Sequence, residues 1–123
     1  MGGLNFSYQN LEVNNLAKKL IKEVYFFTKN FPASEIYGLT KQLRRAMVSV
    51  ALNIAEGSSK KSFLEFNRYI RIAIGSLTEV NCALEIAIEL GYLKVEDYEK
   101  IKLDIQPLYF KLVSLSKYLT NNI

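Results

Sequence analysis

Two carboxylates in strongly apolar surroundings, Glu56 and Glu79, are the first candidates for chemistry. Glu56 ends the run AMVSVALNIAE, and Glu79 follows a Gly-Ser pair in the run IAIGSLTE. Paired carboxylates can act as general acid and base, or bind Mg²⁺ or Mn²⁺ together with water and phosphate. Dimetal four-helix proteins combine such acids with Glu-x-x-His ligands, and this chain contains no histidine. We therefore favour a structural role for both acids over a catalytic or metal-binding role.

The structural interpretation places these acids in a buried polar network between two helices. Residues spaced three and four apart share one face of a helix, and a buried polar group without a partner costs roughly 1–3 kcal/mol. Glycine inside a helix costs about 1 kcal/mol relative to alanine, so Gly75 predicts a close approach by another group. We predict that Arg71 supplies the cation of this network. Its members are Ser49, Asn53, Glu56, Arg71, Gly75, Ser76 and Glu79.

The content of reactive side chains excludes several classes of function. One cysteine and no histidine rule out an internal disulfide, a Cys/His zinc site in one subunit and a histidine-based triad. Cys82 lies within a strongly helical pattern, where we predict a small apolar filler; the alternative, a reactive thiol, lacks a nearby cation in the sequence. We expect no catalytic residues, no metal and no cofactor.

Basic residues are concentrated in the first half of the chain. Residues 1–61 hold nine Lys/Arg and four acids (+5), whereas residues 62–123 hold seven and eight (−1). Lys41, Arg44 and Arg45 are spaced to share one helix face, a pattern that suits electrostatic binding to a phosphate backbone. The alternative is a solvated face with ion pairs to neighbouring acids. The candidates for nucleic-acid contact are Lys41, Arg44, Arg45, Lys60, Lys61 and Arg68.

Apolar residues recur at spacings of three and four, which predicts an all-α protein with four helices over residues 10–30, 34–57, 62–91 and 95–120. A chain of 123 residues fits a single domain, residues 1–123. The predicted boundaries are a Ser34 N-cap, a helix stop at Gly57 and a Ser62–Glu65 capping box. Pro107, inside the fourth segment, predicts a kink or local break.

Short connections favour an antiparallel up-down-up-down four-helix bundle. The second and third helices carry more apolar surface than one bundle can bury, since residues 46–55 are apolar on nearly every side. Exposing such a surface promotes aggregation, so we predict a homo-oligomer. No apolar run reaches the roughly 20 residues needed to span a bilayer, and no signal peptide is recognisable, which together predict a cytoplasmic protein without membrane partners.

The chain also resembles a known family along most of its length. The matching elements are Phe31-Pro32, the Leu-x-x-Gln-x-Arg-Arg-Ala run at 39–46, Asn-Ile-Ala-Glu-Gly at 53–57 and Gly-Ser-x-x-Glu at 75–79. In this combination they are similar to the 23S rRNA intervening-sequence proteins. The departures are mild: residues 47 and 50–52 vary the apolar run, and no Trp occurs in the first helix, where Asn14 and Asn15 stand.

The resemblance implies an antiparallel four-helix bundle that assembles as a homopentamer, with no established catalytic residues. A relative, the accessory variability protein of diversity-generating retroelements, binds its reverse transcriptase and nucleic acid through a basic surface. By matching position, the resemblance makes Arg44, Arg45 and Arg68 candidates for contact. The hypothesis is a non-catalytic oligomer that binds RNA or DNA with little sequence selectivity and serves a reverse-transcriptase-like partner. The alternative is a protein-interaction scaffold without a nucleic-acid role.

Overall fold

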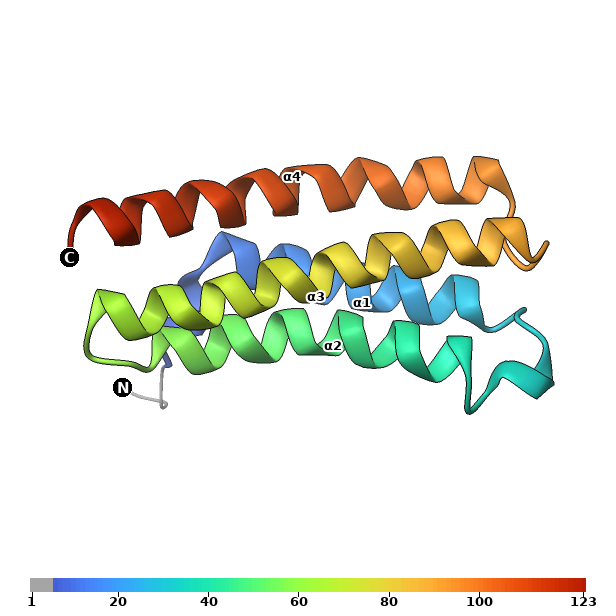
Figure 1. The fold of residues 1–123 in the computed structure, drawn as a ribbon, viewed down its shortest axis with the longest axis horizontal. Coiled ribbons are helices and arrows are strands. Elements are labelled where there is room, and N and C mark those ends of the chain that lie inside the picture. The colour runs from blue at the N-terminus through green and yellow to red at the C-terminus, as the bar shows by residue number, and fades with distance from the viewer. Residues whose placement is uncertain (1–5) are drawn as a thin grey trace, which may run out of the picture.

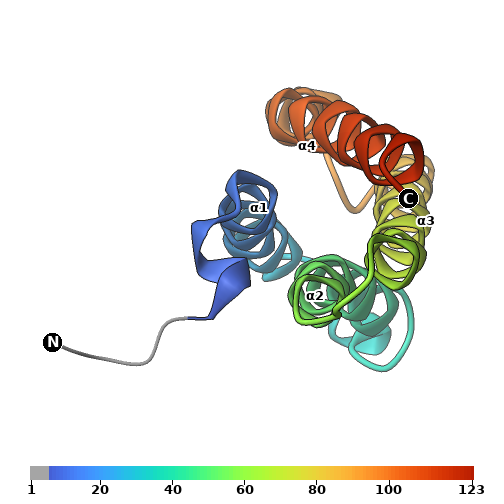
Figure 2. The ribbon, with the colours of Figure 1, turned by 90° about the vertical axis from the view of Figure 1, so that its left-hand side faces the viewer.

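The computed structural model describes residues 6–123, which form four long helices and two short 3-10 turns. Figure 1 shows the helices lying lengthwise side by side, with their connections alternating between the two ends of the molecule. Each helix contacts its neighbours in the ring order α1, α2, α3, α4, and α4 contacts α1 to complete the ring, as the end-on view shows (Figure 2). The elements are η1 (Ser7–Asn10), α1 (Glu12–Thr28), η2 (Ala33–Glu35), α2 (Leu39–Ser58), α3 (Phe63–Glu89) and α4 (Val95–Asn121).

The core is built from the apolar stripes that the sequence periodicity predicts. Leu20, Leu43, Leu77 and Leu108, one from each helix, are almost fully buried. Because residues three and four apart share one helix face, the stripe of each helix points to the bundle axis. The four-helix, all-α prediction is confirmed: residues 6–123 contain no strand. None of the helices in this range is long and apolar enough to cross a membrane.

The second helix begins later than predicted. Ser34 lies in the 3-10 turn η2, and α2 starts at Leu39 instead of at Ser34. The backbone at Gly38 is not helical (φ −109°, ψ −116°), and the Glu35 carboxylate accepts a hydrogen bond from the Leu39 N–H at 3.0 Å. Tyr92 donates to the same carboxylate at 2.9 Å. These two bonds lower the pKa of Glu35. Because Glu35 accepts from the first residue of α2, it caps this helix in place of the predicted Ser34.

The predicted helix stop at Gly57 is one residue early, and the predicted break at Pro107 is absent. Helix α2 continues through Gly57 to Ser58, and α4 runs unbroken from Val95 to Asn121 with Pro107 on its exposed side. Buried Ile105 and Leu108 hold α4 against the core on both sides of the proline, and packing of this kind offsets the one missing backbone hydrogen bond. By contrast, the serine half of the capping box predicted at the start of α3 is present, since Ser62 Oγ accepts from the Glu65 N–H at 3.1 Å.

Gly57 is needed for close packing between α2 and α3, a different role from the predicted helix stop. A Cβ at this position would lie 2.8 Å from Tyr69 Cβ and 3.2 Å from the carbonyl oxygen of Phe66. Gly75, where the sequence predicts a close approach, is exposed, and nothing within residues 6–123 lies within 4 Å of the position that a Cβ would occupy. The tight contact between the two helices is therefore at the turn that joins them.

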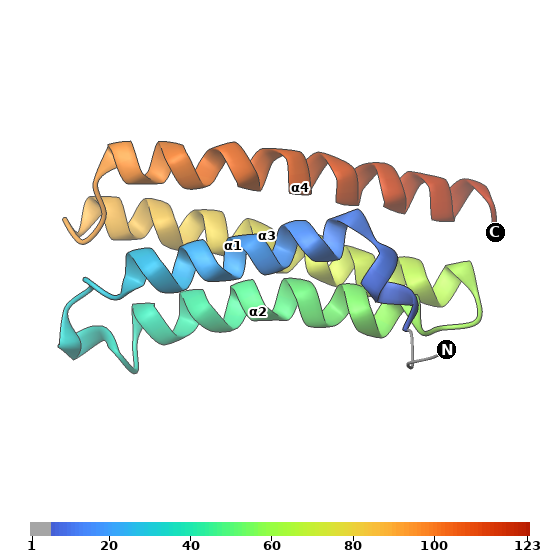
Figure 3. The same cartoon turned by 180° about the vertical axis from the view of Figure 1, so that it is seen from behind.

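Most of the apolar run predicted to be in excess on α2 is covered within one chain, since Leu52 is the one exposed residue of 46–55, whereas α3 leaves part of its apolar surface uncovered. Leu52 on α2 is 62% exposed, and Ile72, Ile86 and Leu90 on α3 are about half exposed. Cys82, predicted as a buried filler, is exposed on α3 because it lies off the main stripe of that helix. The chain thus presents apolar side chains of α2 and α3 to solvent. In the view from behind, α1 lies in front of α3 (Figure 3).

Candidate nucleic-acid interface

Three of the six basic candidates lie together on the first half of α2. Lys41, Arg44 and Arg45, called here the α2 basic cluster, line a cavity of about 540 Å³ that runs along α2 from Thr40 to Asn53, beside Tyr25 of α1. The ion pairs within residues 6–123 involve other cations. Glu79 lines a neighbouring pocket together with Arg45, but no carboxylate of the described residues forms an ion pair with the cluster, so its positive charge is available to an anionic partner.

Arg44 is held in a fixed position by two contacts from α1. Its Nε donates to Thr28 Oγ1 at 2.9 Å, and its guanidinium lies 4.5 Å from the centre of the Tyr25 ring. Thr28, itself buried, donates to the Val24 carbonyl oxygen at 2.7 Å. A guanidinium stacked on an aromatic ring and bonded through Nε keeps its terminal N–H groups for a ligand. Arg44 is therefore oriented before any ligand binds.

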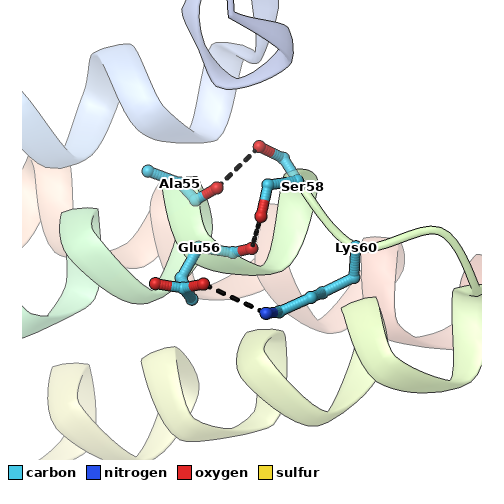
Figure 4. Close-up of polar contacts among 5 residues, drawn as sticks. Ala55, Glu56, Ser58 and Lys60 are labelled. Atoms are coloured by element: carbon cyan, nitrogen blue, oxygen red, sulfur yellow. Dashed lines mark hydrogen bonds and ion pairs between the residues drawn. The ribbon is translucent and has the colours of Figure 1, made fainter.

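The other three candidates lie at the far end of α2. Lys60 pairs with Glu56 at 3.1 Å (Figure 4). Its Nζ lies 5.3 Å from the centre of the Tyr69 ring. The hydrogen bond that Lys60 donates to Glu56 raises the pKa of Lys60. Lys61 and Arg68 are exposed. At 1.5 Å per helical residue, Arg45 and Lys60 are about 22 Å apart along α2. The six candidates therefore form two separate groups on one chain.

The predicted polar network is only partly formed. Ser49 and Ser76 share a hydrogen bond of 3.0 Å, and Asn53 Nδ2 donates to the Ser49 hydroxyl at 3.0 Å and carbonyl at 2.9 Å. Glu79 accepts a hydrogen bond from Gln42 instead, at 2.9 Å. These bonds connect α2 and α3 at the surface, where all five side chains are exposed or half-buried.

Glu56 and Arg71 lie outside this network. The pairing of α2 with α3 places Glu79 beside Gln42, which is about 21 Å along α2 from Glu56 at 1.5 Å per residue. Arg71 lines a different surface pocket together with Ser116 and Lys117 of α4. The two carboxylates do not form a pair, so the acid–base and dimetal hypotheses have no geometric basis. Residues 6–123 contain no cluster of three or more potential metal ligands.

Sequence reasoning missed Tyr25, Thr28 and Thr40 at this interface. Tyr25 and Thr28 occupy the last turn of α1, just before the Phe-Pro break, and so meet the first turns of α2 when the chain reverses. Their position at the end of α1 could have indicated this contact, because a short connection packs the end of one helix against the beginning of the next. The specific pairing with Arg44 depends on the rotation of both helices, which the periodicity of one segment does not define.

A second titratable cluster lies on the opposite seam, between α1 and α4. Lys19 Nζ is 3.4 Å from Asp104 Oδ1, and the neighbouring Glu23 has a buried carboxylate oxygen. When both acids are ionised neither can donate, whereas a proton on Glu23 forms a hydrogen bond to Asp104. Burial, this hydrogen bond and the charge of Asp104 raise the pKa of Glu23 to about 7, against a smaller lowering by Lys19.

Glu23→Gln should remove a pH-dependent loss of stability. The folded chain keeps the Glu23 proton at pH values where the unfolded chain has already released it. The stability that protonated Glu23 contributes is therefore complete below about pH 4.5 and falls as the pH rises to about 7. We expect the variant to be more stable than the natural chain at pH 8 by about 1–2 kcal/mol, after allowance for solvent screening, and equal to it at pH 4.5. Urea unfolding at both pH values measures this; parallel pH profiles would contradict it.

The comparisons with known proteins agree with the four-helix architecture. A model of the 23S rRNA-intervening sequence protein family matches residues 9–114. The chain is also similar to a solved structure, a protein of unknown function from the S23 ribosomal protein family of Bacteroides thetaiotaomicron VPI-5482, at 1.70 Å resolution. The two are 26% identical, with a TM-score of 0.76 over 85% of this chain and 98% of that chain. Among curated proteins there is no match.

Proposed function

This chain belongs to the family of 23S rRNA-intervening sequence proteins, and from that premise we propose that it is a non-catalytic protein that binds RNA or DNA by charge. The observation that carries the proposal is the α2 basic cluster, in which Arg44 is fixed by Thr28 and Tyr25 and no carboxylate pairs with the three cations within residues 6–123. Contacts from Lys and Arg to phosphates give affinity with little sequence selectivity.

We further propose that the antiparallel bundle assembles as a homo-oligomer, with five copies as the expected number. The support is the exposed apolar surface of α2 and α3, where Leu52 and Ile72 are examples. Burying apolar area against sister copies contributes about 25 cal/mol per Å². Assembly also repeats the α2 basic cluster around a ring, which raises the avidity of each weak contact. Sedimentation velocity at micromolar concentration tests this directly, and a monomer would contradict it.

Binding of a synthetic RNA hairpin across a salt series tests the proposed function. The double variant Lys41→Ala/Arg45→Ala should bind at least about tenfold more weakly at low salt, because two cations per chain are no longer there to bind phosphate. The slope of log affinity against log salt should fall by about one for each phosphate-binding cation that the substitutions remove. Arg44 is left unchanged in this variant because its contacts with Thr28 and Tyr25 also support the packing of α1.

The matched control is Lys100→Ala/Lys117→Ala, which removes two exposed cations from α4 and keeps the same net charge as the test variant. It should bind the hairpin almost as well as the natural chain. Equal weakening in the two double variants would mean that only net charge matters and that the α2 basic cluster has no special role. A slope that stays the same in the test variant would equally contradict phosphate contact by Lys41 and Arg45.

A second candidate function is a protein-interaction scaffold without a nucleic-acid role. The observation in its favour is the row of half-exposed apolar residues along α3, which includes Ile72, Ile86 and Leu90. A reverse-transcriptase-like protein is the partner that we expect from the sequence resemblance. Absence of hairpin binding even at low salt would favour this candidate over the first.

A further inference from the structure

A groove follows the seam between α3 and α4, two helices that lie side by side (Figure 1). Two cavities of about 330 and 320 Å³ follow one another along this seam. Together they extend from Arg71 to Asn81 on α3 and from Tyr98 to Lys117 on α4. The lining residues of each helix recur at spacings of three and four, so they share one face of that helix. We call the two cavities together the α3–α4 groove.

The groove has an apolar surface that the chain leaves partly open. Ile74 of α3 and Val113 of α4 line it and are half-buried. Phe110 stands at its rim with 63% of its surface exposed, and its ring meets the Tyr109 ring edge to face, with 5.6 Å between the centroids. Aromatic side chains beside aliphatic ones are typical of the centre of a protein-binding surface.

The charged side chains that line the groove are all cations. Lys102 lies near one end, and Arg71 and Lys117 lie at the other. Residues 62–123 hold eight acids and seven bases, yet none of these acids lines either cavity. Glu85, the next position of the α3 stripe, lies beyond the groove, and the ion pairs within residues 6–123 involve other cations. The groove is therefore complementary in charge to an acidic partner.

This groove is separate from the surface proposed for contact between copies. Ile72 and Ile86 share a different stripe of α3 with Ser76 and Glu79. Ser76 and Glu79 hydrogen-bond to side chains of α2, so this stripe lies on the α2 side of α3, whereas the groove lies on the α4 side. An oligomer that buries the α2 side of α3 leaves the groove free for a different protein.

We propose that the α3–α4 groove binds an acidic amphipathic helix of a protein partner. The apolar face of that helix packs on Ile74, Val113 and Phe110, and its carboxylates pair with Arg71 and Lys117. From Lys102 to Lys117 the groove extends about 22 Å at 1.5 Å per residue, the length of about four helical turns. Helices that dock in this way carry their apolar residues at spacings of three and four. The inference goes beyond nucleic-acid binding and uses none of the α2 basic cluster.

The distribution of charge along the groove favours a helix over a nucleic-acid strand. A strand carries a phosphate on every nucleotide, whereas the cations of the groove lie near its two ends, with Phe110 and Val113 between them. Phosphates in the middle would therefore face apolar side chains. An amphipathic helix can place apolar residues there and carboxylates beside the cations.

Two synthetic peptides with the same composition test the proposal. The first, of about 15 residues, carries leucines on one helical face and glutamates elsewhere. The second has the same residues in an order that spreads the leucines around the helix, so its net charge is unchanged. Isothermal titration on the full chain should show the first binding at least about tenfold more tightly. Equal affinities, or no binding of the first peptide, would overturn the proposal.

Phe110→Ala should weaken binding of the amphipathic peptide about tenfold, as expected for an aromatic residue at the centre of an interface. The matched control is Phe26→Ala, because Phe26 of α1 is 61% exposed and lies outside the groove. The control should leave the affinity unchanged, and equal weakening by both substitutions would contradict docking in the groove. Dissociation of an assembled protein by Phe110→Ala, measured by sedimentation velocity, would identify a second copy as the occupant and overturn the proposal.

Arg71→Ala/Lys117→Ala should weaken binding of the amphipathic peptide about five- to tenfold at low salt and less at high salt. The charge-matched variant Lys41→Ala/Arg45→Ala should leave peptide binding almost unchanged. Equal weakening by both double variants would mean attraction by net charge alone and overturn the proposal.

The same two variants separate this inference from the proposed function. The groove variant should keep the affinity for the RNA hairpin, and the α2 variant should lose it. Peptide binding that depends on the groove, without hairpin binding, would support the groove and overturn the proposed function. Hairpin binding that depends on Lys41 and Arg45, without peptide binding, would do the reverse. Loss of hairpin binding in the groove variant would make the groove a nucleic-acid site and overturn the helix proposal.

Discussion

Replacing Gly57 by alanine is expected to lower the free energy of unfolding by about 2 kcal/mol, the middle of the range for overpacking a close contact. The added methyl group would lie 2.8 Å from Tyr69 Cβ and 3.2 Å from the Phe66 carbonyl oxygen. Neither atom belongs to the flexible end of a side chain, so α2 and α3 must move apart to admit it. Alanine gains at most about 1 kcal/mol in helix propensity, which the overpacking outweighs. Urea unfolding at fixed protein concentration measures the difference.

Gly75→Ala is the matched control, because it makes the same change in the neighbouring helix. Gly75 is exposed in the middle of α3 and has no atom of residues 6–123 within 4 Å of the added methyl group. The control should therefore raise stability by about 0.5–1 kcal/mol through helix propensity alone. Equal effects of the two substitutions would contradict the close approach of α2 and α3 at Gly57. Loss of assembly in the Gly75 variant alone would place that residue in a contact between copies.

The helices were predictable from the sequence because each buries one stripe, and a stripe at spacings of three and four is visible in a single segment. Helix ends are harder to predict, because more than one nearby side chain can cap the same end. Ser34 is a good N-cap by residue type, yet the Glu35 carboxylate caps Leu39 and the chain forms a 3-10 turn first. Gly57 shows the same ambiguity, since a glycine near a helix end also suits a close contact with the next helix.

The candidate site was predictable only where its residues belong to one helix. Lys41, Arg44 and Arg45 share a face because of their spacing, and the structure places all three on one cavity. Glu56 and Glu79 come from different helices, and their distance depends on how α2 and α3 are paired lengthwise. The lengthwise pairing follows from the packing of Gly57 and from the length of the turn at residues 59–62. The apolar periodicity of a single segment predicts neither feature. The same reason explains why Thr28 was not predicted to contact Arg44.

Asn14→Asp is expected to destabilise the protein by about 3 kcal/mol at pH 7, because it places a carboxylate where a buried amide now donates. Asn14 is 1% exposed, and its Nδ2 donates to the Ala51 carbonyl oxygen of α2 at 3.1 Å. An ionised carboxylate cannot donate and would face that carbonyl oxygen in a site closed to water. Burial raises the pKa of the introduced carboxyl, and the protonated form can donate again. The destabilisation should therefore shrink as the pH falls towards 4.

The neighbouring residue provides the control, because Asn15→Asp makes the same chemical change one position along α1. Asn15 is exposed, also in the first turn of α1, where a negative charge is slightly favourable. The control should change stability by no more than about 0.5 kcal/mol, as surface substitutions do, and show little dependence on pH. Thermal or urea unfolding of both variants between pH 4 and 8 decides the matter. Similar stabilities for the two variants at pH 7 would mean that water reaches Asn14 and that α1 packs only loosely on α2 around this residue.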